Sequence, residues 1–303
     1  MIKKESMKNS VALPSSAYFD ISDSYEKMDV GIKRMKQHGF DSIDYQGFAY
    51  DTVLNWSEGE FLERMQAVLK VCSNNGICVF QAHGPSRWPA PDNTEEDRAE
   101  IFEKMSKSIR GTALLECKYL VLHPIMPFGT GKIGDEEARL TREINVEYFC
   151  RLDKVAREYG VVICLENLPF RYFPLSPTAE ILDVVRQINS PNVRICLDTG
   201  HSAMLGDPAY DIRLAGQYIS TVHLHDNNGH RDEHKMPFAG SIDWDGVCRA
   251  LCDVNFNGAL NFETWAQGNY PAELKEYMEN GFSMAVQYVV DMFERFKQDK
   301  IKY

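Results

Sequence analysis

Residues of metal-ligating type recur along this chain at the ends of short apolar runs. Five such segments are AHGP, VLHP, CLENLP, CLDTGH and VHLHDN, and a sixth is LNFET. Their ligand-type residues are His83, His123, Glu166, Asp198, His223 and Glu263. Successive positions are roughly 25–45 residues apart, about the length of one strand–helix unit. In a (β/α)8 TIM barrel the carboxyl ends of all the strands meet at one mouth. The pattern therefore predicts a single α/β barrel in which these side chains converge.

Strand-like and helix-like stretches alternate along almost the whole chain. Apolar runs predict eight strands, within 10–16, 40–48, 77–83, 119–124, 161–167, 193–201, 219–227 and 258–264. Between them the pattern predicts eight helices, at 24–37, 58–74, 94–116, 136–159, 177–188, 207–217 and 243–254, with a final helix of about 25 residues. No linker divides them, so we expect one domain, with the barrel over about 10–297 and short polar ends. A doubly wound open sheet is the rival fold, but eight units favour closure.

The phase of each strand gives a check on this architecture. Side chains alternate between the two faces of a strand, so Glu166 shares a face with Cys164, while Ile163 and Leu165 point the other way. The same alternation places Asp198 with Cys196, Glu263 with Asn261, and His223 with His225. The ligand-type residues therefore lie on the less apolar face, which we expect to be the barrel interior, and the large aliphatic residues face the helices.

Composition narrows the choice of partners and location. The net charge of −11 disfavours nucleic acid as a partner, because proteins that bind it generally carry a basic surface. No apolar run approaches the roughly 20 residues of a membrane-spanning helix. The basic, polar start MIKKESMKNS has no apolar signal-peptide core, so a cytoplasmic location is expected. The eight cysteines contain no CxxC pair, and we expect them to be free thiols.

Four of the strand-end residues form a plausible set of ligands for one cation. Glu166, Asp198, His223 and Glu263 offer three carboxylates and one imidazole. Such an oxygen-rich set suits Mn²⁺, Mg²⁺, Co²⁺ or Zn²⁺. Three carboxylates converging in a barrel mouth would repel one another strongly without a cation. The sequence therefore predicts one divalent metal ion and, with it, a metalloenzyme.

Six further residues are candidates for binding substrate or a second metal: His83, His123, His201, His225, Asp232 and His234. His83 and His123 close neighbouring strands, where polar packing is the alternative role. His201 follows Asp198 by three residues in DTGH, where we expect the chain to turn from strand into loop. Asp232 and His234 form a D-x-H pair in the loop after the seventh strand, which would share a metal or cap that loop.

The ordered set AHGP, VLHP, CLENLP, CLDTGH, VHLHDN, DEH and SIDW resembles the xylose-isomerase-like TIM-barrel superfamily. The branch it resembles contains sugar phosphate isomerases and epimerases, inosose dehydratases and hydroxypyruvate isomerases, and is related to endonuclease IV. The likeness covers nearly the whole chain. It is specific for the superfamily and much less specific for the reaction.

The resemblance implies that one divalent metal is held by Glu166, Asp198, His223 and Glu263. It also implies that the two glutamates are the acid/base pair and that His201 contacts the substrate. The implied activity is that of a sugar isomerase or epimerase acting through a metal-stabilised cis-enediolate on a ketose, keto-inositol or related polyol. Inosose-type dehydration is a variant in which a β-hydroxyl leaves instead of a proton returning. Dimers and tetramers are common in the superfamily, which implies a homo-oligomer.

Endonuclease IV supplies the alternative from another class. That family binds three zinc ions through nine residue positions, and all nine residue types have counterparts here: His83, His123, Glu166, Asp198, His201, His223, Asp232, His234 and Glu263. A zinc-dependent phosphodiesterase that cleaves apurinic sites, with additional Zn²⁺, is therefore the second hypothesis. The acidic charge and the absence of an arginine-rich insertion favour the sugar enzyme. A non-catalytic sugar-binding barrel is disfavoured because all four core ligand types are present.

Overall fold

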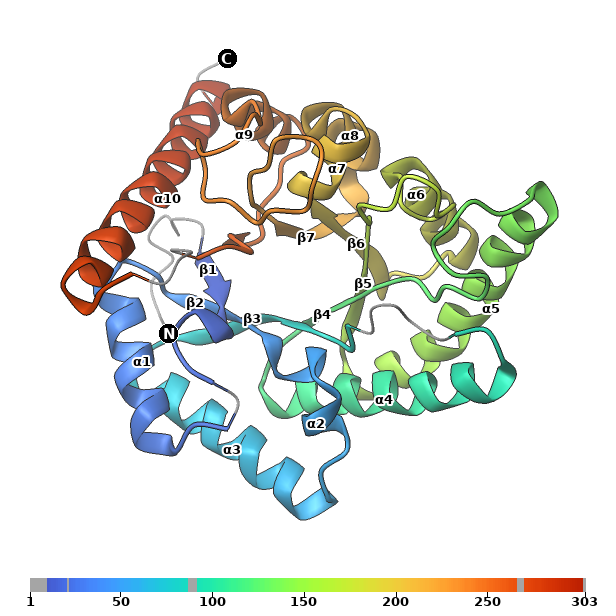
Figure 1. The fold of residues 1–303 in the computed structure, drawn as a ribbon, viewed down its shortest axis with the longest axis horizontal. Helices are drawn as coiled ribbons and strands as arrows, with labels where there is room; N and C mark the ends of the chain where they lie inside the picture. Colours follow the sequence, from blue (N-terminus) through green and yellow to red (C-terminus); the bar gives the residue numbers. More distant parts are fainter. Residues whose placement is uncertain (1–9, 21, 87–91, 266–269, 302–303) are drawn as a thin grey trace.

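The computed structural model describes residues 10–20, 22–86, 92–265 and 270–301, so the predicted polar N-terminal end at 1–9 lies outside the described residues (Figure 1). Eight parallel strands form one sheet in the order β7-β6-β5-β4-β3-β2-β1-β8. They are β1 (Val11–Pro14), β2 (Ser42–Tyr45), β3 (Cys78–His83), β4 (Tyr119–Leu122), β5 (Val162–Glu166), β6 (Val193–Asp198), β7 (Ile219–His223) and β8 (Leu260–Asn261).

A backbone hydrogen bond joins the two ends of this sheet. The amide of Leu224, just after β7, donates to the carbonyl of Asn261 in β8 at 2.8 Å. Because β8 also pairs with β1, the strands form a nearly closed ring and follow chain order around it. The predicted single (β/α)8 barrel is therefore confirmed, and the doubly wound open sheet is excluded, since that fold reverses its strand order at a switch point.

The helices surround the strands (Figure 1). They are α1 (Tyr25–Gln37), α2 (Asp51–Leu54), α3 (Glu58–Asn74), α4 (Glu95–Leu114), α5 (Asp135–Tyr159), α6 (Thr178–Ile188), α7 (Thr199–Leu205), α8 (Pro208–Ala215), α9 (Trp244–Asp253) and α10 (Ala272–Ile301). The prediction of eight helices was wrong by two within the described residues. The short helices α2 and α7 are additional, and DTGH leads from β6 into α7 and not into a loop.

Local sequence signals explain where the longer helices begin. The Ser57 hydroxyl accepts a hydrogen bond from the amide of Glu60, and the Glu60 carboxylate accepts one from the Ser57 amide; this capping box starts α3. Thr94 and Asp97 make the same reciprocal pair at α4. Gly160 ends α5 with a φ of 68°, a left-handed conformation that glycine adopts without strain.

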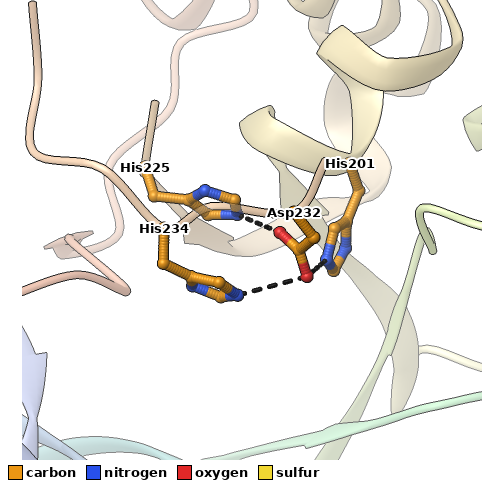
Figure 2. Close-up of side chains that lie close together, drawn as sticks. All are labelled: His201, His225, Asp232 and His234. Atoms are coloured by element: carbon orange, nitrogen blue, oxygen red, sulfur yellow. Dashed lines mark hydrogen bonds and ion pairs between the residues drawn. The ribbon is translucent and has the colours of Figure 1, made fainter. Parts of the chain in front are cut away.

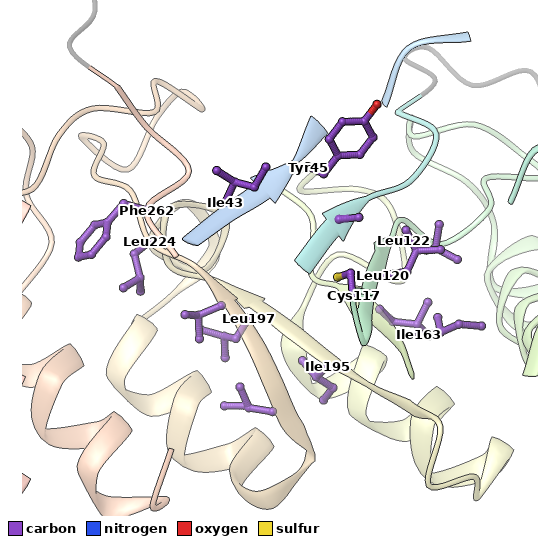
Figure 3. Close-up of a cluster of buried hydrophobic side chains, with 14 of the residues drawn as sticks. Ile43, Tyr45, Cys117, Leu120, Leu122, Ile163, Ile195, Leu197, Leu224 and Phe262 are labelled. Atoms are coloured by element: carbon purple, nitrogen blue, oxygen red, sulfur yellow. The ribbon is translucent and has the colours of Figure 1, made fainter. Parts of the chain in front are cut away.

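Two separate groups of buried side chains confirm the predicted phase of the strands. Ile163, Leu165, Ile195 and Leu197 belong to the large cluster between the strands and the helices, part of which Figure 3 shows. A small second cluster, inside the ring, consists of Val121, Val162, Cys164 and Cys196. The ligand-bearing face therefore points into the barrel. All eight cysteines are free, as expected, and none of the described helices is long and apolar enough to cross a membrane.

Candidate active site

The predicted site residues lie together at the carboxyl-terminal mouth of the barrel. His83, Glu166, Asp198 and His223 are the last residues of β3, β5, β6 and β7, whereas His123 and Glu263 lie just beyond the ends of β4 and β8. A cleft of about 510 Å³ opens there. Its walls are Gln46, Ala49, Tyr50, His83, Ser86, His123, Glu166, Leu168, Pro169, Phe170, His201, Asp232, His234 and Glu263.

The core of the site is the group Glu166, Asp198, His223 and Glu263. Each offers one ligand atom, and the four atoms lie within 4.8 Å of one another. Nδ1 of His223 is 2.6 Å from Oε1 of Glu166 and 3.3 Å from Oε2 of Glu263. Glu166, Asp198 and His223 are almost completely buried, whereas Glu263 is 14% exposed, so it is the most accessible of the four at the cleft.

Burial and charge act against each other in this core. Burial raises the pKa of Glu166, but His223, His123 and His83 more than offset it, and the net pKa lies well below the usual range. Burial likewise lowers the pKa of His223, while Cys196, Glu263 and Glu166 raise it well above 6.5. In this arrangement the histidine holds a proton among carboxylates, which is the position that a divalent cation would take. Three closely grouped carboxylates, two of them buried, and one imidazole therefore fit a divalent metal.

A second group lies beside the core and consists of His201, His225, Asp232 and His234 (Figure 2). Oδ2 of Asp232 is 3.2 Å from Nε2 of His201 and 3.2 Å from Nε2 of His234. The rings of His225 and His234 stack at 4.1 Å between centroids. Burial lowers the pKa of His201 and of His234, but the nearby carboxylates, chiefly Asp198 for His201 and Asp232 for His234, raise both to about 10. This group is a candidate second metal site.

Glu166 links the core to a third set of histidines. Its Oε2 is 3.0 Å from Nε2 of His123 and 3.4 Å from Nε2 of His83. Burial lowers the pKa of His83, but its hydrogen bond to Glu166 raises it above the usual value. Both oxygens of this one carboxylate therefore face imidazoles. A carboxylate in that position is able to bridge two cations.

Three of these histidines are oriented in the same way. His83, His201 and His234 each direct Nδ1 at a main-chain carbonyl, of Gly84, Asn167 and Glu263, at 2.8 to 2.9 Å. An Nδ1–H that donates to a carbonyl leaves the Nε2 lone pair for the cleft. His223 is the reverse case, because its Nδ1 faces the core carboxylates and its Nε2 points down into the barrel.

The loop between β7 and α9, which carries Asp232 and His234, is fixed at both ends by Asp226. Oδ1 of this buried aspartate accepts hydrogen bonds from the amides of Asn227 and Ile242, and Oδ2 accepts from the Trp244 indole at 3.0 Å. Asp226 and Lys235 also exchange backbone hydrogen bonds. The side chain and backbone of Asp226 therefore anchor this loop.

All ten residues predicted from the sequence are brought together, but the prediction omitted the polar layer beneath them. Asp44 and Gln81 are fully buried inside the barrel and contact His223, and Asp44 also contacts Asn261. The sequence did carry one indication of Gln81: it lies two residues before His83 on the same strand, so its side chain shares the inward face. Gln46 and Tyr50, which line the cleft from the segment after β2, were also missed.

Comparisons with known proteins agree with this architecture. A family model described as "Xylose isomerase-like TIM barrel" matches residues 32–283. An uncharacterized protein of Methanocaldococcus jannaschii is 32% identical over 58% of this chain, and the match spans 60% of that protein, less than two thirds of its length. A D-psicose 3-epimerase of Ruminiclostridium cellulolyticum is 32% identical over 66% of this chain and 68% of that enzyme. The solved structure of the IOLI protein with a binding zinc atom has a TM-score of 0.70 at 19% identity, covering 95% of this chain and 99% of that one.

Proposed function

Because the chain belongs to the xylose isomerase-like TIM-barrel family, we propose that it is a divalent-metal-dependent sugar isomerase or epimerase. Its substrate is a ketose, keto-inositol or related polyol. The similarity to a D-psicose 3-epimerase supports this class of reaction. The observation that carries the proposal is the pair of glutamates, Glu166 and Glu263, that line one cleft and share the Asp198–His223 cluster.

In this proposal Glu166, Asp198, His223 and Glu263 hold the metal, and the zinc atom in the IOLI protein supports a cation at such a site. When bound, a divalent ion supplies a Lewis acid that polarises the substrate carbonyl and an adjacent hydroxyl. Mn²⁺, Mg²⁺, Co²⁺ and Zn²⁺ all suit the donor set. The residues of the second group hold the substrate hydroxyls or an additional Zn²⁺.

In this proposal the two glutamates, Glu166 and Glu263, carry out the proton transfers. One carboxylate removes the proton from the carbon next to the carbonyl, and the other returns a proton. Return to the same carbon from the opposite face inverts it, which is epimerisation, whereas return to the neighbouring carbon is isomerisation. His201, on the wall of the cleft, contacts a substrate hydroxyl. Loss of a β-hydroxyl in place of the second transfer gives the dehydratase variant.

Exchange of the substrate's α-proton with solvent tests the roles of the glutamates. We expect the manganese-loaded protein to incorporate deuterium from D₂O into at least one member of a ketose and inosose panel. Glu263→Gln should abolish this incorporation while leaving the fold intact, because an amide cannot accept the proton. Glu103→Gln, on the exposed surface of α4, is the matched control and should exchange at the wild-type rate.

Incorporation at the wild-type rate in Glu263→Gln would remove Glu263 from the proposed chemistry. The signal is direct, because deuterium incorporation reports proton removal even where the equilibrium between two sugars lies far to one side. Circular dichroism of both variants shows that a loss of exchange is not a loss of fold.

The geometry also supports a second candidate, a zinc-dependent phosphodiesterase. The specific observation is that a second metal-capable group, His201–His225–Asp232–His234, lies beside the core and that Glu166 also faces His83 and His123. Several closely spaced cations suit phosphodiester hydrolysis. Two or three zinc ions per chain, together with cleavage of a duplex that carries an abasic analogue, would favour this candidate. The net charge of −11 disfavours it. The homo-oligomeric state and cytoplasmic location stay predictions.

A further inference from the structure

A buried carboxylate lies beneath the candidate metal site, and the proposed reaction gives it no role. Asp44, on β2, has no exposed surface and sits in the barrel interior. Its Oδ2 is surrounded by four nitrogen atoms, at 3.0 to 3.2 Å, which come from Gln46, Gln81, His223 and Asn261. Burying a carboxylate costs free energy unless it is paired and hydrogen-bonded, so its position calls for a reason.

The charged partner of Asp44 identifies that reason. Among the described residues, its ion pair is with His223, whose Nε2 lies 3.2 Å from Oδ2, and both side chains have no exposed surface. No lysine or arginine of the described chain pairs with it there. Asp44 is thus directed at the single imidazole of the four-residue core.

The orientation of His223 makes this contact specific. Its Nδ1 faces Glu166 and Glu263, so this nitrogen is the one that would bind a cation. A neutral imidazole that gives its Nδ1 lone pair to a cation must carry its proton on Nε2. The Nε2–H then points at Asp44, and a carboxylate is the strongest acceptor available for it. His83, His201 and His234 each direct Nδ1 at a main-chain carbonyl, whereas His223 directs its second nitrogen at an acid.

We propose that Asp44 is a positioning residue for the metal site: it accepts the Nε2–H of His223, fixes the tautomer in which Nδ1 is the ligand, and increases the donor strength of that nitrogen. Partners of this kind behind a ligating histidine typically change metal affinity by about 10- to 100-fold. The inference rests on the proposed metal dependence, but it concerns a residue that does not itself reach the cleft.

Gln81 fits the same arrangement. Its Nε2 lies 2.9 Å from Nε2 of His223 and 3.0 Å from Oδ2 of Asp44, while its Oε1 is buried without a hydrogen-bond partner. Gln81 thus donates an N–H to Asp44 and holds that carboxylate beside Nε2 of His223.

Cobalt binding tests the proposal without an activity assay. Co²⁺ is titrated into metal-free protein, and the dissociation constant and visible spectrum are recorded. We expect Asp44→Asn, which keeps the side-chain shape, to weaken Co²⁺ binding by about 10- to 100-fold. Asp153→Asn is the matched control, because Asp153 is a buried aspartate of α5 whose partners, Ser190 and Arg157, do not line the cleft. It should leave the dissociation constant unchanged.

The outcomes separate this inference from the proposed function. Wild-type Co²⁺ affinity and spectrum in a folded Asp44→Asn would overturn the role of Asp44 and leave the metal site standing. A wild-type protein that binds no Co²⁺ would overturn both. If Asp44→Asn does not fold, ¹⁵N-histidine spectra of the zinc-loaded wild type decide instead. The proposal requires that His223, assigned by the loss of its signals in His223→Gln, has Nδ1 on the metal and a slowly exchanging Nε2–H, and the opposite tautomer would overturn it.

Discussion

Gly200 determines how closely two parts of the site approach each other. It lies in α7, directly after Asp198-Thr199, and the ring of His225 rests against its backbone. His225 has little room to move, because its Nε2 binds Oδ2 of Asp198 at 3.0 Å and its ring stacks on His234. A side chain at position 200 would therefore push into the hydrogen bond and the stack that connect the core to the second group.

We expect Gly200→Ala to lower the free energy of unfolding by about 1–3 kcal/mol, since a methyl group there overlaps the His225 ring. Gly59→Ala is the matched control, because Gly59 also lies in the first turn of a helix but has open space around it. An alanine there should stabilise slightly, by roughly 0.5–1 kcal/mol. Urea denaturation of both variants measures the difference, and equal effects would contradict the packing argument.

The residues that sequence reasoning found and those that it missed differ in one respect. Glu166 and His223 end apolar strands, where a ligand-type residue stands out and where barrel geometry gives it a role. Asp44 and Gln81 lie within strands, one or two residues before the mouth. Their importance depends on which side chains of neighbouring strands they meet, and that depends on barrel stagger and register, for which a single strand carries no signal.

At the level of elements, the loop from β7 to α9 is ordered by one buried acid. Asp226 accepts from both ends of the loop and from the Trp244 indole, and Gly240 passes so close to Asp226 and Asn227 that a side chain there would overlap them. Asp232 and His234 project from the segment between these anchors. The Asp226 anchors therefore help to hold Asp232 and His234 beside His201, although neither residue lies in a helix or strand.

We expect Asp226→Asn to loosen this loop. An amide presents only one acceptor oxygen in place of two, so at least one buried donor loses its partner, which costs about 1–3 kcal/mol of unfolding free energy. Hydrogen exchange should quicken in the 226–244 segment and stay unchanged in α4. Trp244→Phe removes a single donor and should have the smaller effect. Unchanged exchange in 226–244 would show that the loop is held by other contacts.

The long helices were predictable and the short ones were not, for a physical reason. Helices such as α3 and α4 can be predicted from their apolar periodicity and from the capping box at their start. α7 spans only Thr199–Leu205 and begins because Asp198 accepts from the His201 amide. An aspartate at the end of a strand is equally compatible with a ligand, a loop or a helix cap. Here it is a cap and a member of the core at once, and a seven-residue helix is too short for periodicity to reveal it.

At the scale of the whole molecule, barrel closure makes the core a junction between distant parts of the chain. Glu166, Asp198 and His223 end three adjacent strands, and Glu263 follows β8, to which the backbone hydrogen bond from Leu224 to Asn261 joins the end of β7. A cation held by all four residues would therefore connect β5, β6, β7 and β8, the second half of the ring. Removal of the cation should therefore lower the stability of the whole fold.

We expect a divalent metal to raise the thermal midpoint of the protein, and to raise it more at pH 8 than at pH 6. A ligand at 100 times its dissociation constant stabilises a fold by about 2.7 kcal/mol, which corresponds to several degrees. The pH dependence follows from His223. Burial lowers its pKa, but Cys196, Glu263 and Glu166 raise it, so that in the metal-free fold it lies well above 6.5. The metal must displace that proton, and displacement becomes easier as pH rises.

The stability of the metal-free protein changes in the opposite direction and falls as pH rises. A histidine whose pKa is raised by folding stabilises the fold fully below its unfolded pKa of about 6.5, and this contribution is lost as pH rises towards the folded pKa. This loss and the easier displacement of the proton are one and the same linkage, and it widens the stability gap between metal-bound and metal-free protein with increasing pH. Thermal scans with and without chelator at the two pH values measure that gap, and Asp198→Asn should shrink it at both. A gap that is constant or narrower at pH 8 would mean that the cation does not displace the His223 proton, and hence that it is bound elsewhere.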